Sequence, residues 1–250
     1  MSWVLNHPLA VFAVSLAAQW AAAYCGDVAR RLIKQIASAE REQFSTVLAA
    51  TLTLLGLLIG FSFSMAVSRY DLRVSAEAAE ANAIGTQYLR ADLLAPEDAS
   101  KLRTLLARYA QTRVEFFRDN TDPNVTAENT ALQSQLWSTV TQAAAARQTP
   151  ITALTVSGMN DVLSAQGVTQ AAWSNRIPLP AWGLMMLIAL LANFMLGYNE
   201  KRTDLLVLLV LPTVISIALL LIADIDSPTN GIIRVDPHNV TAAIRDMTGH

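Results

Sequence analysis

Residues 55–71 read LGLLIGFSFSMAVSRYD, and this stretch decides the fold class of the chain. It begins as an apolar run, contains two glycines four residues apart, and carries serines before an Arg-Tyr-Asp ending. An apolar run inside a longer apolar segment is typical of a transmembrane helix. A helix that only anchored the chain would need neither the spaced glycines nor the hydroxyl groups. The stretch therefore predicts a membrane helix that makes a contact or performs a function.

The composition also indicates a membrane protein. Of the 250 residues, 53% are hydrophobic and 15% are charged, and the mean hydropathy is +0.35. Soluble domains carry about 25% charged residues. The net charge of −2 provides no concentrated basic face for phosphate groups, so nucleic acid is not an expected partner. The single cysteine, Cys25, can form neither a disulfide framework nor a thiolate metal site.

Four segments are apolar and long enough to cross a bilayer, which takes about 20 residues. They cover approximately residues 8–25, 44–67, 179–198 and 205–223. The first segment could be mistaken for a signal peptide. However, no lysine or arginine precedes it, and Tyr24 is unfavourable at a cleavage site. We therefore predict an all-α, polytopic membrane protein with four transmembrane helices.

The remaining residues divide the chain into further parts. We predict a first transmembrane pair in residues 1–67, a helical extramembrane domain in 68–178, a second pair in 179–223 and a C-terminal tail in 224–250. Neither glycine nor proline occurs between Val67 and Arg73, so the second membrane helix should continue into the extramembrane domain.

Three further helices are expected within the extramembrane domain. The first follows Pro96, which suits an N-terminal helical turn, and has an apolar face that includes Leu102 and Leu106. The second covers about residues 126–147. The third follows Pro150 and is expected to fray near Gly167.

The membrane orientation can be judged from basic residues in the short loops. The first and third loops together carry Arg30, Arg31, Lys34, Arg41, Lys201 and Arg202. The opposite helix ends carry Arg69, Arg73, Arg176 and Arg234. The difference favours cytoplasmic first and third loops, with both termini and the extramembrane domain outside.

The sequence gives no support for catalysis. It lacks the phosphate-binding, nucleophile-elbow, zinc-protease and dithiol motifs, and its three histidines have no metal-ligand spacing. We expect no enzyme activity, no cofactor and no metal. Glu77 and Glu80 lie three residues apart and could serve a di-metal site, but the favoured interpretation is a solvated helical face. Asn193, in the third apolar segment, is expected to need an interhelical hydrogen-bond partner.

The second membrane helix has one narrow stripe of small, hydroxyl and apolar side chains. At about 100° per residue, the stripe contains Thr53, Leu57, Gly60, Ser64 and Ser68, with Gly56 and Phe61 beside it. Gly56 and Gly60 would permit close packing of two helices, within one subunit or between subunits. The same stripe could instead line a pore. The spacing by itself favours the packing interpretation.

Two motifs carry a resemblance to a known family. GFSFSMAVSRYD (residues 60–71) and EANAIGTQYLRADLL (80–94) resemble the bacterial DUF4239, or bestrophin-like domain, proteins, as does DIDSPTNGIIRVDP (224–237). The Gly-Phe pair, Val67 and the Arg69-Tyr70 pair are also similar to the second membrane helix of bestrophins, which are pentameric anion channels. The resemblance implies a multi-pass protein of the bacterial cytoplasmic membrane that forms a homo-oligomer, pentameric by analogy.

The resemblance also implies roles for individual residues. Thr53, Leu57 and Phe61 would form the narrow neck of a pore for small ions, with anions favoured. Arg69, Tyr70 and Asp71 would lie at the pore exit. Thr53 replaces a bulky apolar residue, and Asp71 adds a negative charge that does not favour anions. Bestrophins also keep their helical region and termini in the cytosol, contrary to the charge count. The alternative function is a non-conducting membrane interaction or sensory protein whose helical domain binds a partner.

Overall fold

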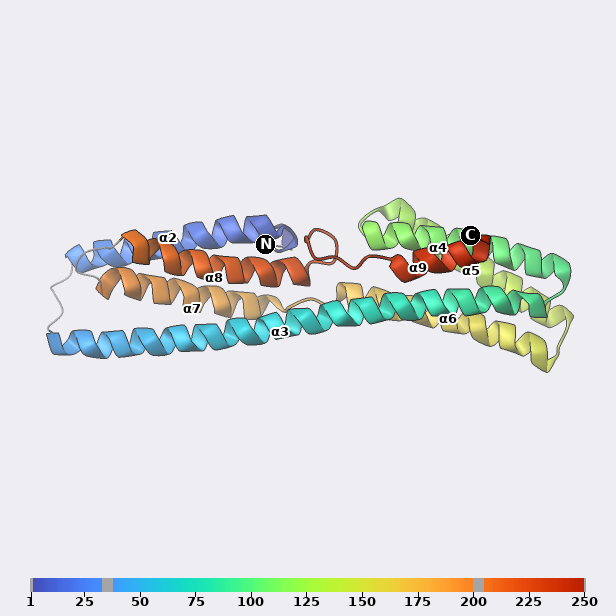
Figure 1. Cartoon of the computed structure of the whole chain (residues 1–250), viewed down its shortest axis with the longest axis horizontal. Helices are drawn as coiled ribbons and strands as arrows, with labels where there is room; N and C mark the ends of the chain where they lie inside the picture. Colours follow the sequence, from blue (N-terminus) through green and yellow to red (C-terminus); the bar gives the residue numbers. More distant parts are fainter. Residues whose placement is uncertain (1, 33–37, 200–204, 250) are drawn as a thin grey trace. The chain divides into compact units, whose positions relative to one another are not determined.

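In the computed structural model, residues 2–32, 38–199 and 205–249 are described, with side chains excepted at 2–3, 38–41 and 205–208. Every regular element among these residues is helical, as Figure 1 shows. The helices are α1 (Ser2–Asn6), α2 (Pro8–Leu32), α3 (Ser38–Arg90), η1 (Ala91–Leu93), α4 (Pro96–Arg118), α5 (Pro123–Ala146), α6 (Pro150–Ser174), α7 (Leu179–Asn199), α8 (Leu205–Asp226) and α9 (His238–Thr248). The predicted all-α fold class is confirmed.

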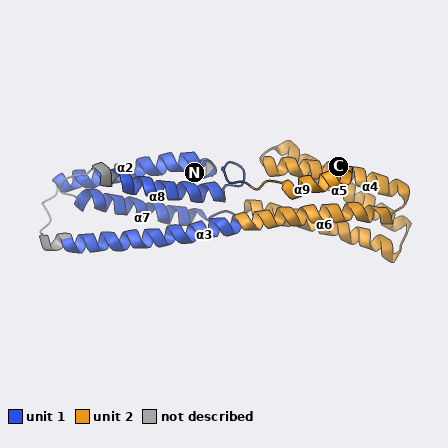
Figure 2. Ribbon diagram, in the orientation of Figure 1, with its two compact units in different colours: residues 1–69, 176–234 blue, residues 70–175, 235–250 orange. Residues whose placement is uncertain are grey.

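The chain forms two compact units, coloured separately in Figure 2. The first unit comprises residues 1–69 and 176–234, and the second comprises residues 70–175 and 235–250. Four stretches among the described residues are long and apolar enough to cross a membrane: Pro8–Leu32, Glu42–Leu93, Pro150–Asn199 and Leu209–Asp226. The expectation of membrane-spanning helices is therefore supported by four candidate spans.

The predicted helices are present, but α2 runs to Leu32, beyond its predicted end near residue 25, and α3 begins at Ser38, before its predicted start near residue 44. The second apolar segment continues without a break, because α3 runs from Ser38 to Arg90. Pro96 occupies the first turn of α4, where its missing N–H leaves no hydrogen bond unmade. The expected fraying of the third helix near Gly167 is wrong, since α6 ends at Ser174. Its last turns are held by the buried side chains of Thr169 and Trp173.

In the first unit, α2 and α7 pack closely through small residues. A Cβ atom added to Gly26 would collide with the backbone of Phe194, and one added to Gly197 would collide with the backbone of Ala23. Backbones can approach this closely only where the side chain is a hydrogen atom. This pair of glycines, which lie on different helices, was not recognised in the sequence.

A buried polar cluster joins three helices of the first unit. Asn193 on α7 donates to Gln19 Oε1 on α2 at 3.0 Å, and Gln19 Nε2 lies 3.0 Å from the Ser216 hydroxyl on α8. All three side chains are buried. The prediction that Asn193 has an interhelical partner is confirmed, and the bonds fix the register of the three helices because an unpaired amide in an apolar layer is costly.

The second unit has a conventional apolar core. It is built mainly from α3, α4, α5, α6 and α9, with fully buried side chains at Ile84, Leu102, Leu106, Tyr109, Leu132, Leu136, Met159, Val162 and Val240. Residues of α4 and α5 in this core recur at intervals of three or four, which is the helical period read from the sequence. The core holds the last third of α3 among four other helices.

Candidate functional site

The membrane-spanning part of α3 has one face that packs within the chain. Leu48, Leu55, Ser62 and Ala66 are all buried and lie on this face. Near its start, Leu48 belongs to a small apolar cluster with residues of α7, including Ala192. These positions recur every four to seven residues, so they form a single line along the helix. This line is the packed face of α3.

The residues predicted to line a pore lie on the opposite side of α3. At about 100° per residue, their mean direction is about 180° from the packed face. All of them are exposed within the chain: Thr53, Leu57, Gly60, Phe61, Ser64 and Ser68. The exposed fraction is 54% for Leu57 and 63% for Phe61. We call this side the exposed face of α3.

Gly56 and Gly60 of α3 have no neighbour outside their own helix among the described residues. A Cβ atom built on Gly56 or on Gly60 would meet no described atom within 4 Å. The interpretation of GxxxG as a tight contact inside one subunit therefore has no support among the described residues, in contrast to the contact made by Gly26 and Gly197. A packing role of Gly56 and Gly60 is therefore not fulfilled by any described residue of this chain.

The hydroxyl group of Thr53 is satisfied by its own helix. Its Oγ1 donates to the carbonyl oxygen of Ala49 at 2.9 Å. A hydroxyl bonded in this way can face an apolar environment at low cost and still accept a hydrogen bond from water. The exposed face is thus weakly polar without carrying any unpaired donor at this position.

The structure separates the three residues predicted at the pore exit. Arg69 turns toward Asp226, with 3.7 Å between Nη1 and Oδ1, and its side chain is only 13% exposed. Tyr70 is partly buried against the core of the second unit. Asp71 is exposed. Of the three residues, Asp71 is the most exposed, and the other two are partly covered.

The sequence motif around Asp226 has a structural role within the first unit. Asp226 accepts a hydrogen bond from Ile177 N at 3.1 Å and pairs with Arg176 at 3.4 Å. The preceding Asp224 accepts from the backbone N–H groups of Ile232 and Ile233 at 2.7 and 2.9 Å. Asp224 thus holds the segment after α8, and Asp226 holds the start of the segment before α7.

The interpretation of Glu77 and Glu80 as a solvated face is wrong. Their exposed fractions are 1% and 0%. Glu80 pairs with the buried Arg113 and accepts a hydrogen bond from Thr169 Oγ1 at 2.7 Å. Burial, and then the nearby Glu80, raise the pKa of Tyr109 above its ordinary value. Buried charges of this kind occur where they are paired.

Glu77 has a different partner. Its carboxylate accepts from Asn239 Nδ2 at 2.5 Å and from Val240 N at 2.9 Å, at the first turn of α9. The residue before α9 is Pro237, which offers no side-chain cap. Glu77 thus caps α9 from another helix, and its negative charge meets the positive end of the helix dipole. No cluster of three or more metal-ligating side chains occurs among the described residues.

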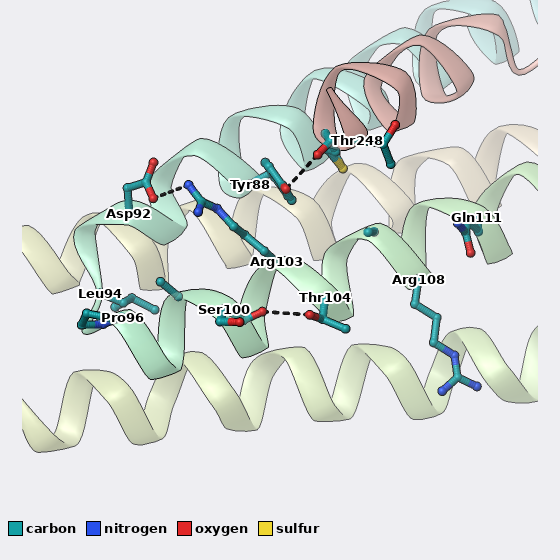
Figure 3. Close-up of a pocket in the computed structure, with 13 residues that line it drawn as sticks. Tyr88, Asp92, Leu94, Pro96, Ser100, Arg103, Thr104, Arg108, Gln111 and Thr248 are labelled. Carbon is teal, nitrogen blue, oxygen red and sulfur yellow. Dashed lines mark hydrogen bonds and ion pairs between the residues drawn. The ribbon is translucent and has the colours of Figure 1, made fainter. Parts of the chain in front are cut away.

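A cleft of about 830 Å³ lies in the second unit, where α4 meets the end of α3 and the end of α9 (Figure 3). Arg103 points across it toward Asp92 and lies 5.3 Å from the centre of the Tyr88 ring. The Tyr88 hydroxyl donates to the backbone oxygen of Met247 at 2.9 Å. Arg108, also at this cleft, pairs with Glu128 on α5. The arginines are already paired with carboxylates, so the cleft resembles a structural groove rather than an anion site.

Comparison with known proteins identifies relatives of the whole chain. The bestrophin-like domain family matches residues 11–240. A bacterial bestrophin homologue from Klebsiella pneumoniae has a similar structure, with a TM-score of 0.63, 14% identity and coverage of 96% of this chain and 98% of that one. A structure described as a membrane protein has a TM-score of 0.66, 15% identity and coverage of 96% and 97%. No curated protein matches the sequence. These structural likenesses establish the fold.

Proposed function

The chain belongs to the bestrophin-like domain family, and from this membership and the surface of α3 we propose that it is a homo-oligomeric membrane channel for small ions. The observation that carries the proposal is the exposed face of α3. It lies opposite the packed face, and it combines hydroxyl and apolar side chains with two glycines that meet no described residue outside their own helix. A weakly polar helix face that no described residue of its own chain covers is suited to a pore that several copies enclose.

Within the proposed pore, Thr53, Leu57 and Phe61 form the neck. They are spaced by four residues, so each lies about one turn beyond the last on the same side of α3. Large apolar side chains in a narrow ring impede ions, because water in the constriction loses hydrogen bonds that it cannot replace. Thr53 makes the first ring wetter than the other two. The remaining lining residues, Ser64 and Ser68, offer hydroxyl groups.

The assembly proposed is a closed ring, with five subunits as the number that the family analogy suggests. Closed rotational symmetry is the usual form of a homo-oligomer, and a central pore requires it. Gly56 and Gly60 lie at or near the contacts between α3 helices. The lipid bilayer, proposed to be the bacterial cytoplasmic membrane, and the permeating ions are the other partners. No cofactor and no catalytic step form part of the proposal.

Two measurements on the purified full chain test this function. The mass of the detergent-solubilised particle, corrected for bound detergent, should be that of several copies. Liposomes that contain the protein should release trapped ions faster than empty liposomes. A monomeric particle without flux would contradict both the ring and the channel. An oligomer without flux would instead favour the alternative, an interaction or sensory protein whose second unit binds a partner.

The orientation of the second unit is proposed from the charge count alone. Lys34, Arg41, Lys201 and Arg202 contribute to that count and lie outside the residues whose side chains the structure describes. We propose that the first and third loops are cytoplasmic. A cysteine at Asn120, in a Cys25→Ser background, should then react with an impermeant maleimide added to intact cells. Labelling only after lysis would reverse the orientation and agree with bestrophins.

A further inference from the structure

Asp71 is the only charged residue among the exposed side chains of α3 between Thr53 and Leu89. The exposed residues that surround it along the helix are apolar, small or uncharged polar, among them Ser64, Ser68, Ser75, Asn82 and Thr86. Asp71 follows Ser68 by three residues, so it continues the line of proposed lining residues beyond the apolar segment. The exposed face of α3 therefore carries one negative charge and no positive charge over this length.

The two arginines closest to Asp71 in the sequence do not share its exposure. Arg69, two residues before it, is 13% exposed and pairs with Asp226. Arg73, two residues after it, is 1% exposed and lies 3.4 Å from the carbonyl oxygen of Ala172. Residues two apart on a helix point in widely different directions, so Arg73 is buried and Arg69 is mostly covered while the carboxylate of Asp71 is exposed. The positive charges of Arg69 and Arg73 therefore lie mostly within the protein and not on the exposed face of α3.

Asp71 also has no partner within its own helix. A basic residue three or four positions away could neutralise it, but those positions hold Val67, Ser68, Val74 and Ser75. Among the described residues, Asp71 forms neither a hydrogen bond nor an ion pair. Glu77 and Glu80, the next carboxylates along α3, are buried and fully engaged. The charge of Asp71 is therefore not neutralised by a described residue, and it acts on the surroundings of the exposed face of α3.

We infer that Asp71 makes the channel prefer cations, contrary to the anion preference that the family analogy suggests; this inference rests on the proposed channel function. In a closed ring, every copy contributes one carboxylate around the same axis. A ring of acidic side chains concentrates cations at the pore mouth and repels anions. The effect acts through water, so it depends on ionic strength: the screening length is about 10 Å at 0.1 M salt and about 30 Å at 0.01 M.

The test is the reversal potential of the reconstituted full-length channel in a gradient of potassium chloride. The wild type should be more permeable to K⁺ than to Cl⁻. Asp71→Asn should lower the K⁺/Cl⁻ permeability ratio by about threefold or more, and Asp71→Lys should bring it below one. Asp71→Glu, which keeps the charge, should retain the preference. The matched control is Glu115→Gln, which removes an exposed carboxylate from α4 and should leave the ratio unchanged.

The possible outcomes test the role of Asp71 and the channel function separately. A conducting wild type that prefers chloride, or an Asp71→Asn channel with an unchanged ratio, overturns the role of Asp71 and leaves the channel function intact. A protein that does not conduct at all removes the channel function, and the inference with it. If Asp71→Asn fails to assemble, the wild type still provides a test. Its K⁺ preference must weaken as the salt concentration rises, and a preference independent of salt contradicts the inference.

Discussion

The two faces of α3 are built differently and meet different surroundings. The packed face carries the buried residues Leu55 and Ala66 and, further along, Glu80, which pairs with Arg113 of α4. The exposed face carries Leu57 and Phe61, which are more than half exposed. Among the described residues, α3 therefore has one face that is covered and one that is not. Under the proposed function, other copies of the chain complete the exposed face.

Two pairs of glycines in the first unit differ in the same way. Gly26 and Gly197 are required by the close approach of α2 and α7, because a Cβ atom at either position would strike backbone. Gly56 and Gly60 are not required by any described contact within the chain. A GxxxG pattern is thus a guide to packing between helices, and the structure is needed to tell which helices are meant.

The largest expected effect comes from breaking the packed face at Glu80. Glu80→Ala leaves Arg113 buried without its carboxylate, so the free energy of unfolding should fall by about 3–5 kcal/mol. Thermal unfolding of the purified protein measures the loss. The matched control is Arg108→Ala on α4, which breaks the exposed pair with Glu128 and should change the free energy by about 0–1 kcal/mol. Equal losses from the two variants would contradict the contrast between buried and exposed charges.

A second prediction compares the same kind of change on the two faces. Ala66 is 0% exposed, so Ala66→Leu should overpack the first unit and lower the free energy of unfolding by about 1–3 kcal/mol. Gly60→Leu should leave membrane insertion and helix content intact but reduce the mass of the solubilised particle, because the added side chain lies between copies. Light scattering measures the mass of the particle and so distinguishes the Gly60→Leu variant from the Ala66→Leu variant. A Gly60→Leu protein that assembles like the wild type would place the exposed face away from the subunit contacts.

A smaller effect is expected where α3 caps α9. Glu77→Ala removes the carboxylate that accepts from Asn239 and Val240, so α9 should lose about 1–2 kcal/mol of stability. Hydrogen exchange of the amides in α9 should become faster, while exchange in α4 should change little. Unchanged exchange in α9 would show that the buried Val240 side chain holds the helix without the cap.

The smallest effect on stability, with the clearest effect on function, is expected at Phe61. Phe61→Ala removes a side chain that is 63% exposed, so the stability should change by less than about 0.5 kcal/mol while ion flux rises. Leu187→Ala on α7 is the control, because Leu187 is also 63% exposed but lies on another helix. An increase in flux in both variants would indicate a general leak. Loss of stability without any change in flux would assign Phe61 to packing.

The sequence was sufficient for the helices and insufficient for the long-range contacts. Proline and the helical period located α4 and α6, because these signals are local. Glu80 looked solvated because its partners, Arg113 and Thr169, are 33 and 89 residues away in the sequence. The same holds for Glu77, whose partner Asn239 is 162 residues away. A buried charge is recognisable only when its distant partner is known.

At the candidate site, too, the sequence predicted part of the arrangement and missed contacts that come from distant residues. The stripe on α3 could be read from helical spacing, and its exposure within the chain agrees with a role outside the chain. Helical spacing places Arg69 and Asp71 on different sides of α3, but it could not tell that Arg69 is the covered residue while Asp71 is the exposed one. The covered position of Arg69 reflects its pairing with Asp226, which belongs to a different helix.

The most direct test of the account is chemical modification of a cysteine placed on the exposed face while current is recorded. The Phe61→Cys channel, in a Cys25→Ser background, should react with a charged methanethiosulfonate reagent, and its conductance should change because the reagent enters the pore. The Leu187→Cys channel should be unaffected, since that residue, equally exposed within the chain, is expected to face lipid. A conductance that responds at Leu187 and not at Phe61 would contradict the central claim that the exposed face of α3 lines the conduction path.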